Sequence, residues 1–264
     1  MRVHGMVRQL GIAIVLAGTA SAQFYTLPAE FKCMAKVSKA GSKFMAARTK
    51  CATKCFQNVW KGLVPASDCS PPYGAFMQVC AGNAEGKFAY GISKACDPDF
   101  NPGTDCPECY SGGNCGLSGE SSSRVHDFAA QIDGFYPGLF CEVSPTPFLL
   151  EMRCMATAAK GVVKHFAKVT KCYDKCYGLV QKGVVPALDC APPASQPLVA
   201  ECLADARADQ IKYIDHDCGP PPASPDGCGS PYPTAEEWVD YAEALTVGDV
   251  PLTYCASPSG AFVE

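Results

Sequence analysis

Two stretches of the chain show a helical spacing of apolar and polar residues most clearly. In residues 28–62, one arc of an ideal helix carries the apolar side chains Phe31, Met34, Val37, Phe44 and Val59. Lysines occupy the opposite arc, and residues 149–183 repeat this pattern. Each stretch therefore predicts one long amphipathic helix, ended by a glycine, Gly62 or Gly183.

A second helix is predicted after each long one, over residues 74–94 and 196–215, where Cys-Asp-Pro and Cys-Gly-Pro sequences end the pattern. In the second copy, Thr146 can cap the long helix, and Pro147 suits its first turn. The predicted fold class is mainly α, a tandem duplication of a disulfide-stapled antiparallel helical hairpin. Each repeat should continue into a loop-rich, proline-rich C-terminal part.

The duplication is visible when the two halves are aligned at an offset of 121 residues. Thr49-Lys50-Cys51-x-x-Lys54-Cys55 then matches Thr170-Lys171-Cys172-x-x-Lys175-Cys176. Sixteen of the eighteen cysteines recur in the same pattern, and Cys109 and Cys115 alone lack counterparts. These matches predict a first repeat at 23–143, a linker at 144–147 and a second repeat at 148–264.

The first 22 residues have the features of a secretory signal peptide. Arg2 and Arg8 precede an apolar run from Leu10 to Leu16, and Ala20-Ser21-Ala22 supplies small residues for cleavage. The run is too short to span a bilayer. The sequence therefore predicts a secreted or periplasmic protein, cleaved near Ala22 and without a transmembrane span.

An even number of cysteines in an oxidising compartment predicts nine disulfides, with zinc ligation as the alternative. Paired positions in an antiparallel hairpin have nearly constant index sums, which favours three nested bridges in each repeat. Cys106 with Cys141 and Cys228 with Cys255 would close the remainder of each repeat, and Cys109 and Cys115 lie close enough in sequence to pair. The predicted pairs are Cys33–Cys96, Cys51–Cys80, Cys55–Cys69, Cys106–Cys141, Cys109–Cys115, Cys154–Cys218, Cys172–Cys202, Cys176–Cys190 and Cys228–Cys255.

Basic side chains form a row on each predicted long helix. The rows are Lys32, Lys39, Lys43, Lys50, Lys54 and Lys61, then Arg153, Lys160, Lys164, Lys171, Lys175 and Lys182. The whole chain has a net charge of -4, although both long helices are strongly positive. One hypothesis is an anion-binding face for acidic polysaccharide or lipid headgroups. The other is an ordinary solvated helix face.

A calcium-loop template fits the segment after Cys96. Oxygen-bearing side chains occupy positions 1, 3, 5, 9 and 12 of a twelve-residue loop, namely Asp97, Asp99, Asn101, Asp105 and Glu108. Against this, Pro102 stands where such a loop needs glycine, and the second repeat has Gly219-Pro220-Pro221-Pro222 instead. The alternative is an acidic, proline-rich turn. Calcium is the one cofactor that the sequence suggests.

Catalytic motifs are weak. His126-Asp127 and His216-Asp217 resemble the His-Asp motif of secreted phospholipases but lack its double-cysteine context, and His165 aligns with apolar Phe44. Cys106-Pro107-Glu108-Cys109 lacks the strand-helix setting of a redox C-x-x-C, so both cysteines are predicted to be structural.

The leading hypothesis for function is a non-enzymatic interaction or structural module with a basic helix face. Its partner would be a polyanion, an anionic surface or another exported protein. Export and net acidity argue against nucleic acid. A small-molecule or lipid carrier is the alternative, because disulfide-bonded helical hairpins resemble saposin-like and coiled-coil-helix proteins in architecture, although the cysteine spacings of those families differ. A secreted hydrolase is a remote third hypothesis.

Overall fold

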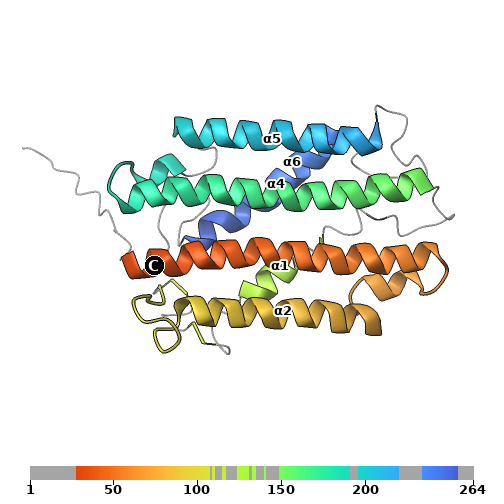
Figure 1. Ribbon diagram of the computed structural model, residues 1–264, viewed down its shortest axis with the longest axis horizontal. Helices are drawn as coiled ribbons and strands as arrows, with labels where there is room; N and C mark the ends of the chain where they lie inside the picture. Colours follow the sequence, from red (N-terminus) through yellow and green to blue (C-terminus); the bar gives the residue numbers. More distant parts are fainter. Residues whose placement is uncertain are drawn as a thin grey trace, which may run out of the picture.

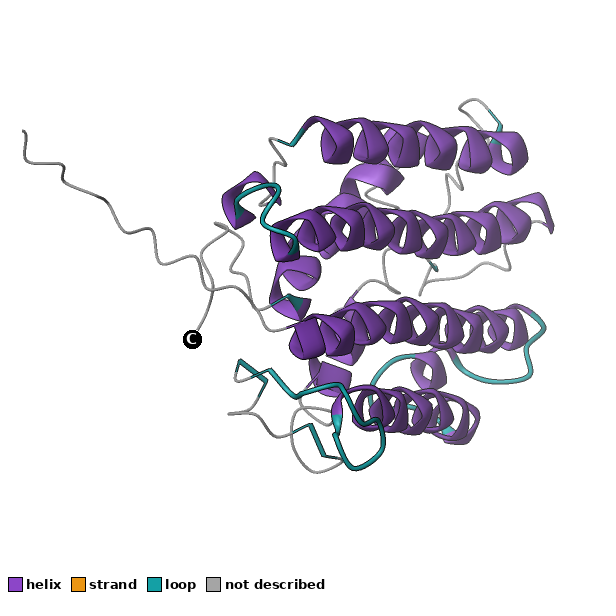
Figure 2. Ribbon diagram, turned by 60° about the vertical axis from the view of Figure 1, so that its left-hand side comes forward, coloured by secondary structure: helices purple, strands orange, loops and turns teal. Residues whose placement is uncertain are grey.

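The computed structural model is mainly helical and contains no strand in the residues that it describes (Figure 2). Those residues are 28–107, 109–110, 115–116, 124–130, 133–134, 140, 149–190, 196–219 and 234–254. The predicted signal peptide, the 144–147 linker, Glu108, Cys141 and the Cys228–Cys255 pair lie outside them.

The first pair of long helices consists of α1 (Pro28–Trp60) and α2 (Ala75–Cys96), with the short helix η1 (Ala66–Cys69) between them. A glycine cap ends α1. Gly62 has a φ of 67°, and the Leu63 amide donates a hydrogen bond to the Asn58 carbonyl at 2.9 Å. Because glycine adopts positive φ without steric cost, the helix stops where the sequence predicts.

The second pair has the same dimensions. Helix α4 (Leu149–Gln181) has 33 residues, as α1 has, and α5 (Pro197–Cys218) has 22, as α2 has. The short helix η2 (Ala187–Cys190) again lies between the two. Gly183 caps α4 with a φ of 69°, and Val184 donates to Leu179 at 2.9 Å.

Three nested disulfides join the helices of each pair. They are Cys33–Cys96, Cys51–Cys80 and Cys55–Cys69 in the first pair, and Cys154–Cys218, Cys172–Cys202 and Cys176–Cys190 in the second. The outermost bridge links the start of the first helix to the end of the second, so each pair is antiparallel. These six bridges are the same pairs that the index sums predict.

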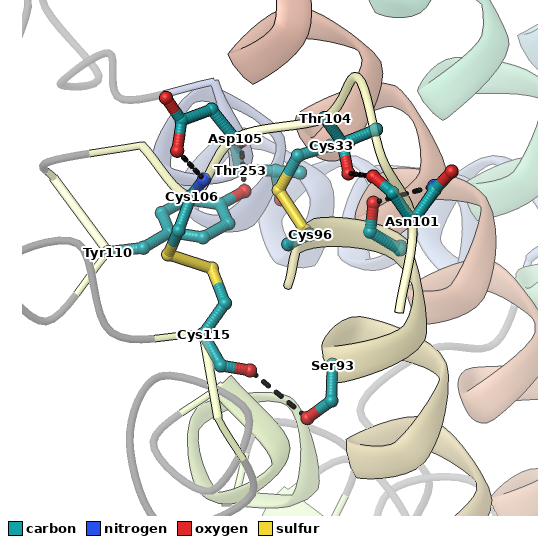
Figure 3. The surroundings of a disulfide bond; sticks show 11 residues. Cys33, Ser93, Cys96, Asn101, Thr104, Asp105, Cys106, Tyr110, Cys115 and Thr253 are labelled. Atoms are coloured by element: carbon teal, nitrogen blue, oxygen red, sulfur yellow. Dashed lines mark hydrogen bonds between the residues drawn. A yellow bond between two sulfur atoms is a disulfide. The ribbon is translucent and has the colours of Figure 1, made fainter. Parts of the chain in front are cut away.

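The pairing after α2 differs from the prediction. Cys106 bonds to Cys115, with an S–S distance of 2.01 Å, so the predicted Cys106–Cys141 and Cys109–Cys115 pairs are wrong. Cys109 is disulfide-bonded as well. The Ser93 hydroxyl at the end of α2 donates to the Cys115 carbonyl at 3.0 Å and holds this cysteine beside Cys106 (Figure 3). The prediction of these two pairs rests on closeness in sequence and on the resemblance between the two repeat ends, not on index sums, and the described residues 97–107 after α2 form turns rather than a helix.

The four long helices form a row in the order α5, α4, α1, α2 (Figure 1). The central two, α1 and α4, run in opposite directions, and the Ser38 hydroxyl of α1 donates to Asp174 of α4 at 2.8 Å. Helix α6 (Ala235–Thr253) crosses behind α4 (Figure 1). A short helix over residues 124–130 contacts α1 and α2 through Phe128, which lies edge-on to Phe88 at 5.4 Å between ring centroids.

The presence of α6 corrects the prediction of a loop-rich C-terminal part in the second half. Its N-terminus is a capping box, in which the Glu237 amide donates to the Thr234 hydroxyl and the Thr234 amide donates to the Glu237 carboxylate. The helix joins the shared core of both halves. Thus the ring of Tyr254, just after α6, stacks on the ring of Tyr177 of α4 with 4.4 Å between centroids, and its centroid lies 6.1 Å from that of Phe31 of α1.

Candidate binding surface

All twelve cations of the two predicted rows are exposed. On α1, most residues that lie between the lysines of the row are buried against neighbouring elements. Gly41, for example, approaches Phe128 so closely that an added Cβ would lie 3.1 Å from the ring. On α4, His165 and Tyr177 are buried toward α6 and its C-terminal end. Each central helix therefore exposes one narrow stripe, and that stripe is basic.

The two stripes share one face of the molecule. Helices α1 and α4 have neighbours on both sides in the row, and α6 and residues 124–130 pack against them from behind. The remaining front face is the one that both helices leave to solvent. Because the axes of packed helices usually lie about 8–10 Å apart, we expect the two rows to lie close together on this face.

Few carboxylates neutralise this surface. Of the twelve cations, Arg153 pairs with Asp217 at 2.7 Å, and the eleven lysines form no ion pair with a described residue. Asp174 lies at the seam between α1 and α4, where it accepts hydrogen bonds from Ser38 and Tyr254. Burial raises the pKa of Asp174 to about 6, despite the opposing effects of its Ser38 hydrogen bond and nearby Lys171 and Lys39.

A groove opens between α1 and α2, with a volume of about 360 Å³. Its floor is apolar and consists of Ala40, Phe44, Ala47, Ala84, Phe88 and Gly91, and its rim carries Lys36, Lys39, Lys43 and Lys87. The Phe44 and Phe88 rings stack at 4.9 Å between centroids, which gives the floor a fixed shape. No pattern within a single helix predicts this groove. The sequence does carry one sign of it, because Gly91 lies inside a predicted helix and aligns with Tyr213 of the second half.

Arg48 forms a buried charge cluster that the sequence analysis also missed. Its guanidinium contacts Glu85 of α2, donates to Asp133 at 2.6 Å and donates to the Tyr73 hydroxyl at 2.9 Å. Burial alone would lower the pKa of Arg48, but hydrogen bonding and the charge of Asp133 outweigh it and raise the pKa. The cluster ties residues 133–134 to the first helix pair, a structural role.

Arg207 has the corresponding role in the second half. It lies on α5 and forms ion pairs with Asp240 at 2.6 Å and Glu243 at 2.9 Å, both on α6. The position of Arg207 in α5 is equivalent to that of Glu85 in α2. The second helix of the pair therefore carries an acidic residue at this position in the first half and a basic residue in the second half. In both halves an arginine of a helix pair forms ion pairs with a segment later in the chain, residues 133–134 in the first half and α6 in the second.

The calcium template gains no support from the geometry. The Asp97 carboxylate accepts from the Asp99 amide at 2.9 Å, and the Asp105 carboxylate accepts from the Cys106 amide at 3.0 Å. Asn101 uses its amide to donate to the Ala95 carbonyl at 3.2 Å, near the end of α2 (Figure 3). Among the described residues, no three acidic side chains of the calcium template lie close enough together to hold one metal ion. Calcium binding stays a prediction.

The sulfur atoms of Cys33, Cys96 and Cys115 do lie within 4.8 Å of one another. All three belong to disulfides, as Figure 3 shows. A metal would need thiolates, so this cluster is structural.

The histidines do not form a catalytic arrangement in the described part of the chain. His126 is exposed. His216 lies 3.2 Å from Asp217, but hydrogen bonds from Thr157 and Arg153 engage that carboxylate and lower the pKa of Asp217 to about 2. His165 is buried, and burial lowers its pKa to about 4.

No described helix is long and apolar enough to cross a membrane. The many disulfides are consistent with an extracellular protein. Compared with protein-family models, curated proteins and solved structures, the chain matches none.

Proposed function

We propose that this chain is an exported, duplicated helical module, stapled by disulfides, whose basic face binds a polyanion. The N-terminal 22 residues support export as a signal peptide, and cleavage near Ala22 would release the mature chain. The equal helix lengths, glycine caps and nested bridges of the two pairs support duplication.

The single observation that carries the binding proposal is the shared face of α1 and α4. From Lys32 to Lys54 the row on α1 is about 33 Å long, at 1.5 Å per residue. Helix α4, which carries the second row, runs beside α1 in the opposite direction (Figure 1). An elongated polymer with closely spaced carboxylates or sulfates matches such a surface, because it can contact both rows along their length.

Disulfides give the surface its rigidity. Each bridge contributes roughly 2–4 kcal/mol by restricting the unfolded chain, although the contributions do not simply add. The lysines are therefore presented on a fixed scaffold, which reduces the entropy lost on binding.

Chromatography of the mature, oxidised protein on immobilised heparin tests the proposal. We expect retention at low salt and elution as salt rises, since counterions screen the lysines. Replacing Lys50 and Lys171 by Gln should lower the eluting salt concentration. The matched control replaces Lys94 and Lys212 by Gln, because both are exposed, lie outside the rows and the groove rim, and remove the same charge.

Flow-through of the wild-type protein at low salt would refute polyanion binding. Equal shifts for the two double variants would show that net charge, not the face, causes retention. A parallel run with vesicles of anionic and neutral phospholipid distinguishes a polymer from a membrane surface as the anion source.

A further inference from the structure

The groove between α1 and α2 has the properties of a small ligand site. Its volume of about 360 Å³ lies at the lower end of the range of roughly 300–1,000 Å³ that is usual for ligand pockets. Two buried, stacked phenylalanines, Phe44 and Phe88, form its floor. Along α1 it extends from Lys36 to Ala47, about 16 Å at 1.5 Å per residue.

The second helix pair shows that such a groove is not a necessary result of this packing. Tyr213 stands at the position of Gly91, and its ring lies 3.5 Å from the Lys164 ammonium. At the position of Phe88, Gln210 reaches so close to Gly161 that an added Cβ would lie 2.5 Å from its amide nitrogen. The corresponding space in the second pair is thus occupied by its own side chains.

The rim determines which ligand the groove can accept. Lys36, Lys39, Lys43 and Lys87 surround the apolar floor, and none forms an ion pair with a described carboxylate. In the second pair, the position of Lys87 carries Asp209, which forms an ion pair with Lys168. An apolar floor below several unpaired ammonium groups complements a ligand with an apolar chain and an anionic head.

We propose that the α1–α2 groove binds a single-chain anionic amphiphile, such as a long-chain carboxylate. The chain lies on Phe44, Phe88 and Gly91, and the head group contacts the lysines of the rim. This ligand site goes beyond the polyanion proposal and does not rest on it. It gives the carrier hypothesis a specific location.

Titration calorimetry of the mature, oxidised protein with dodecanoate tests the site. We expect saturable binding with one ligand per chain. Affinity should rise from octanoate to dodecanoate by roughly fourfold per methylene group, because burying one methylene group contributes about 0.8 kcal/mol. Dodecanol should bind at least about tenfold more weakly, because it cannot pair with the lysines. Monododecyl phosphate should bind as dodecanoate does if charge rather than the carboxylate is recognised.

Gly91→Tyr reproduces the second pair and should weaken dodecanoate binding by at least about tenfold. The control is Gly82→Tyr, on the same helix but exposed, with no atom within 4 Å of an added Cβ. A second variant, Lys87→Asp, leaves the floor intact and should weaken dodecanoate but not dodecanol. Heparin retention should survive Gly91→Tyr, which separates the two proposals.

Three results would overturn the ligand site. They are no saturable binding of dodecanoate by the wild-type protein, equal binding by folded Gly91→Tyr and wild type, and equal affinity for dodecanol and dodecanoate. Circular dichroism and a count of free thiols establish that the variants fold and form their disulfides.

Discussion

Gly91 of α2 and Tyr213 of α5 occupy equivalent positions, each eleven residues after one bridged cysteine and five before the next. At Gly91 the absent side chain leaves the groove between α1 and α2 open. At Tyr213 the aromatic ring lies under the ammonium of Lys164. Two helix pairs with the same bridges thus differ in the surface that they present to solvent.

Arg48 should contribute more to stability than Arg207. The side chain of Arg48 is 2% exposed, whereas that of Arg207 is 33% exposed. Arg48→Met leaves the Asp133 carboxylate without its partner and should cost about 3 kcal/mol in the free energy of unfolding. Arg207→Met should cost about 1 kcal/mol or less, because solvent screens the pair. Guanidinium denaturation of the oxidised variants measures both, and equal losses would contradict this assignment.

His165 should make the protein sensitive to acid. Burial lowers its pKa from 6.5 to about 4, so the unfolded chain takes up a proton at a higher pH than the folded one. The stability from neutral His165 is present above pH 6.5 and is lost as pH falls toward 4.

His165→Phe, which introduces the residue at the equivalent position in α1, should remove this loss. The gain over wild type should be larger at pH 5 than at pH 7, by roughly 2 kcal/mol. Thermal unfolding at both pH values measures the difference, and His126→Phe, at an exposed position, is the control. An unchanged dependence on pH in His165→Phe would show that another group is responsible.

Asp174 should have the opposite effect of pH. Burial raises its pKa from 3.8 to about 6, so the folded chain binds the proton more tightly. The stability from this group is complete below pH 3.8 and is lost as pH rises through 6. Asp174→Asn keeps an oxygen that can accept from Ser38 and Tyr254 but carries no charge. We expect a higher melting temperature than wild type above pH 6 and little difference near pH 4. A lower melting temperature at pH 7.5 would be evidence against this role.

The Cys106–Cys115 bridge can be tested by digestion without reduction. A protease that cleaves after glutamate separates residues 86–108 from residues 109–120. Because Cys115 bonds to Cys106, residues 109–120 should appear in mass spectra cross-linked to residues 86–108, in a species that also includes residues 31–85 through the Cys33–Cys96 bridge. A free 109–120 peptide with an internal disulfide would support Cys109–Cys115 instead.

The sequence predicts the parts of the fold that repeat and are regular. Gly62 and Gly183 mark helix ends because they adopt positive φ, and index sums pair the cysteines where the chain is helical. Thr234 and Glu237 have the spacing of a capping box, which is a sequence signal for the start of α6. The Arg48 cluster depends on Asp133, 85 residues away, and no local pattern links the two.

The sequence predicts each row of basic residues, but it does not predict that the two rows share one face. The shared face depends on α1 and α4 lying side by side as the central two of the four long helices (Figure 1), which the pattern of a single helix does not specify. The groove likewise needs two helices, although aligning Gly91 with Tyr213 would have indicated where the halves differ.

Titration of the mature, oxidised protein with a heparin-derived oligosaccharide, at several salt concentrations, tests most directly whether α1 and α4 act as one anion-binding face. We expect affinity to fall steeply with salt, and to fall further when Lys50 and Lys54, or Lys171 and Lys175, are replaced by Gln. Each pair should weaken binding, because the ligand contacts both rows. No binding at low salt, or binding that neither pair of substitutions weakens, would contradict the shared face.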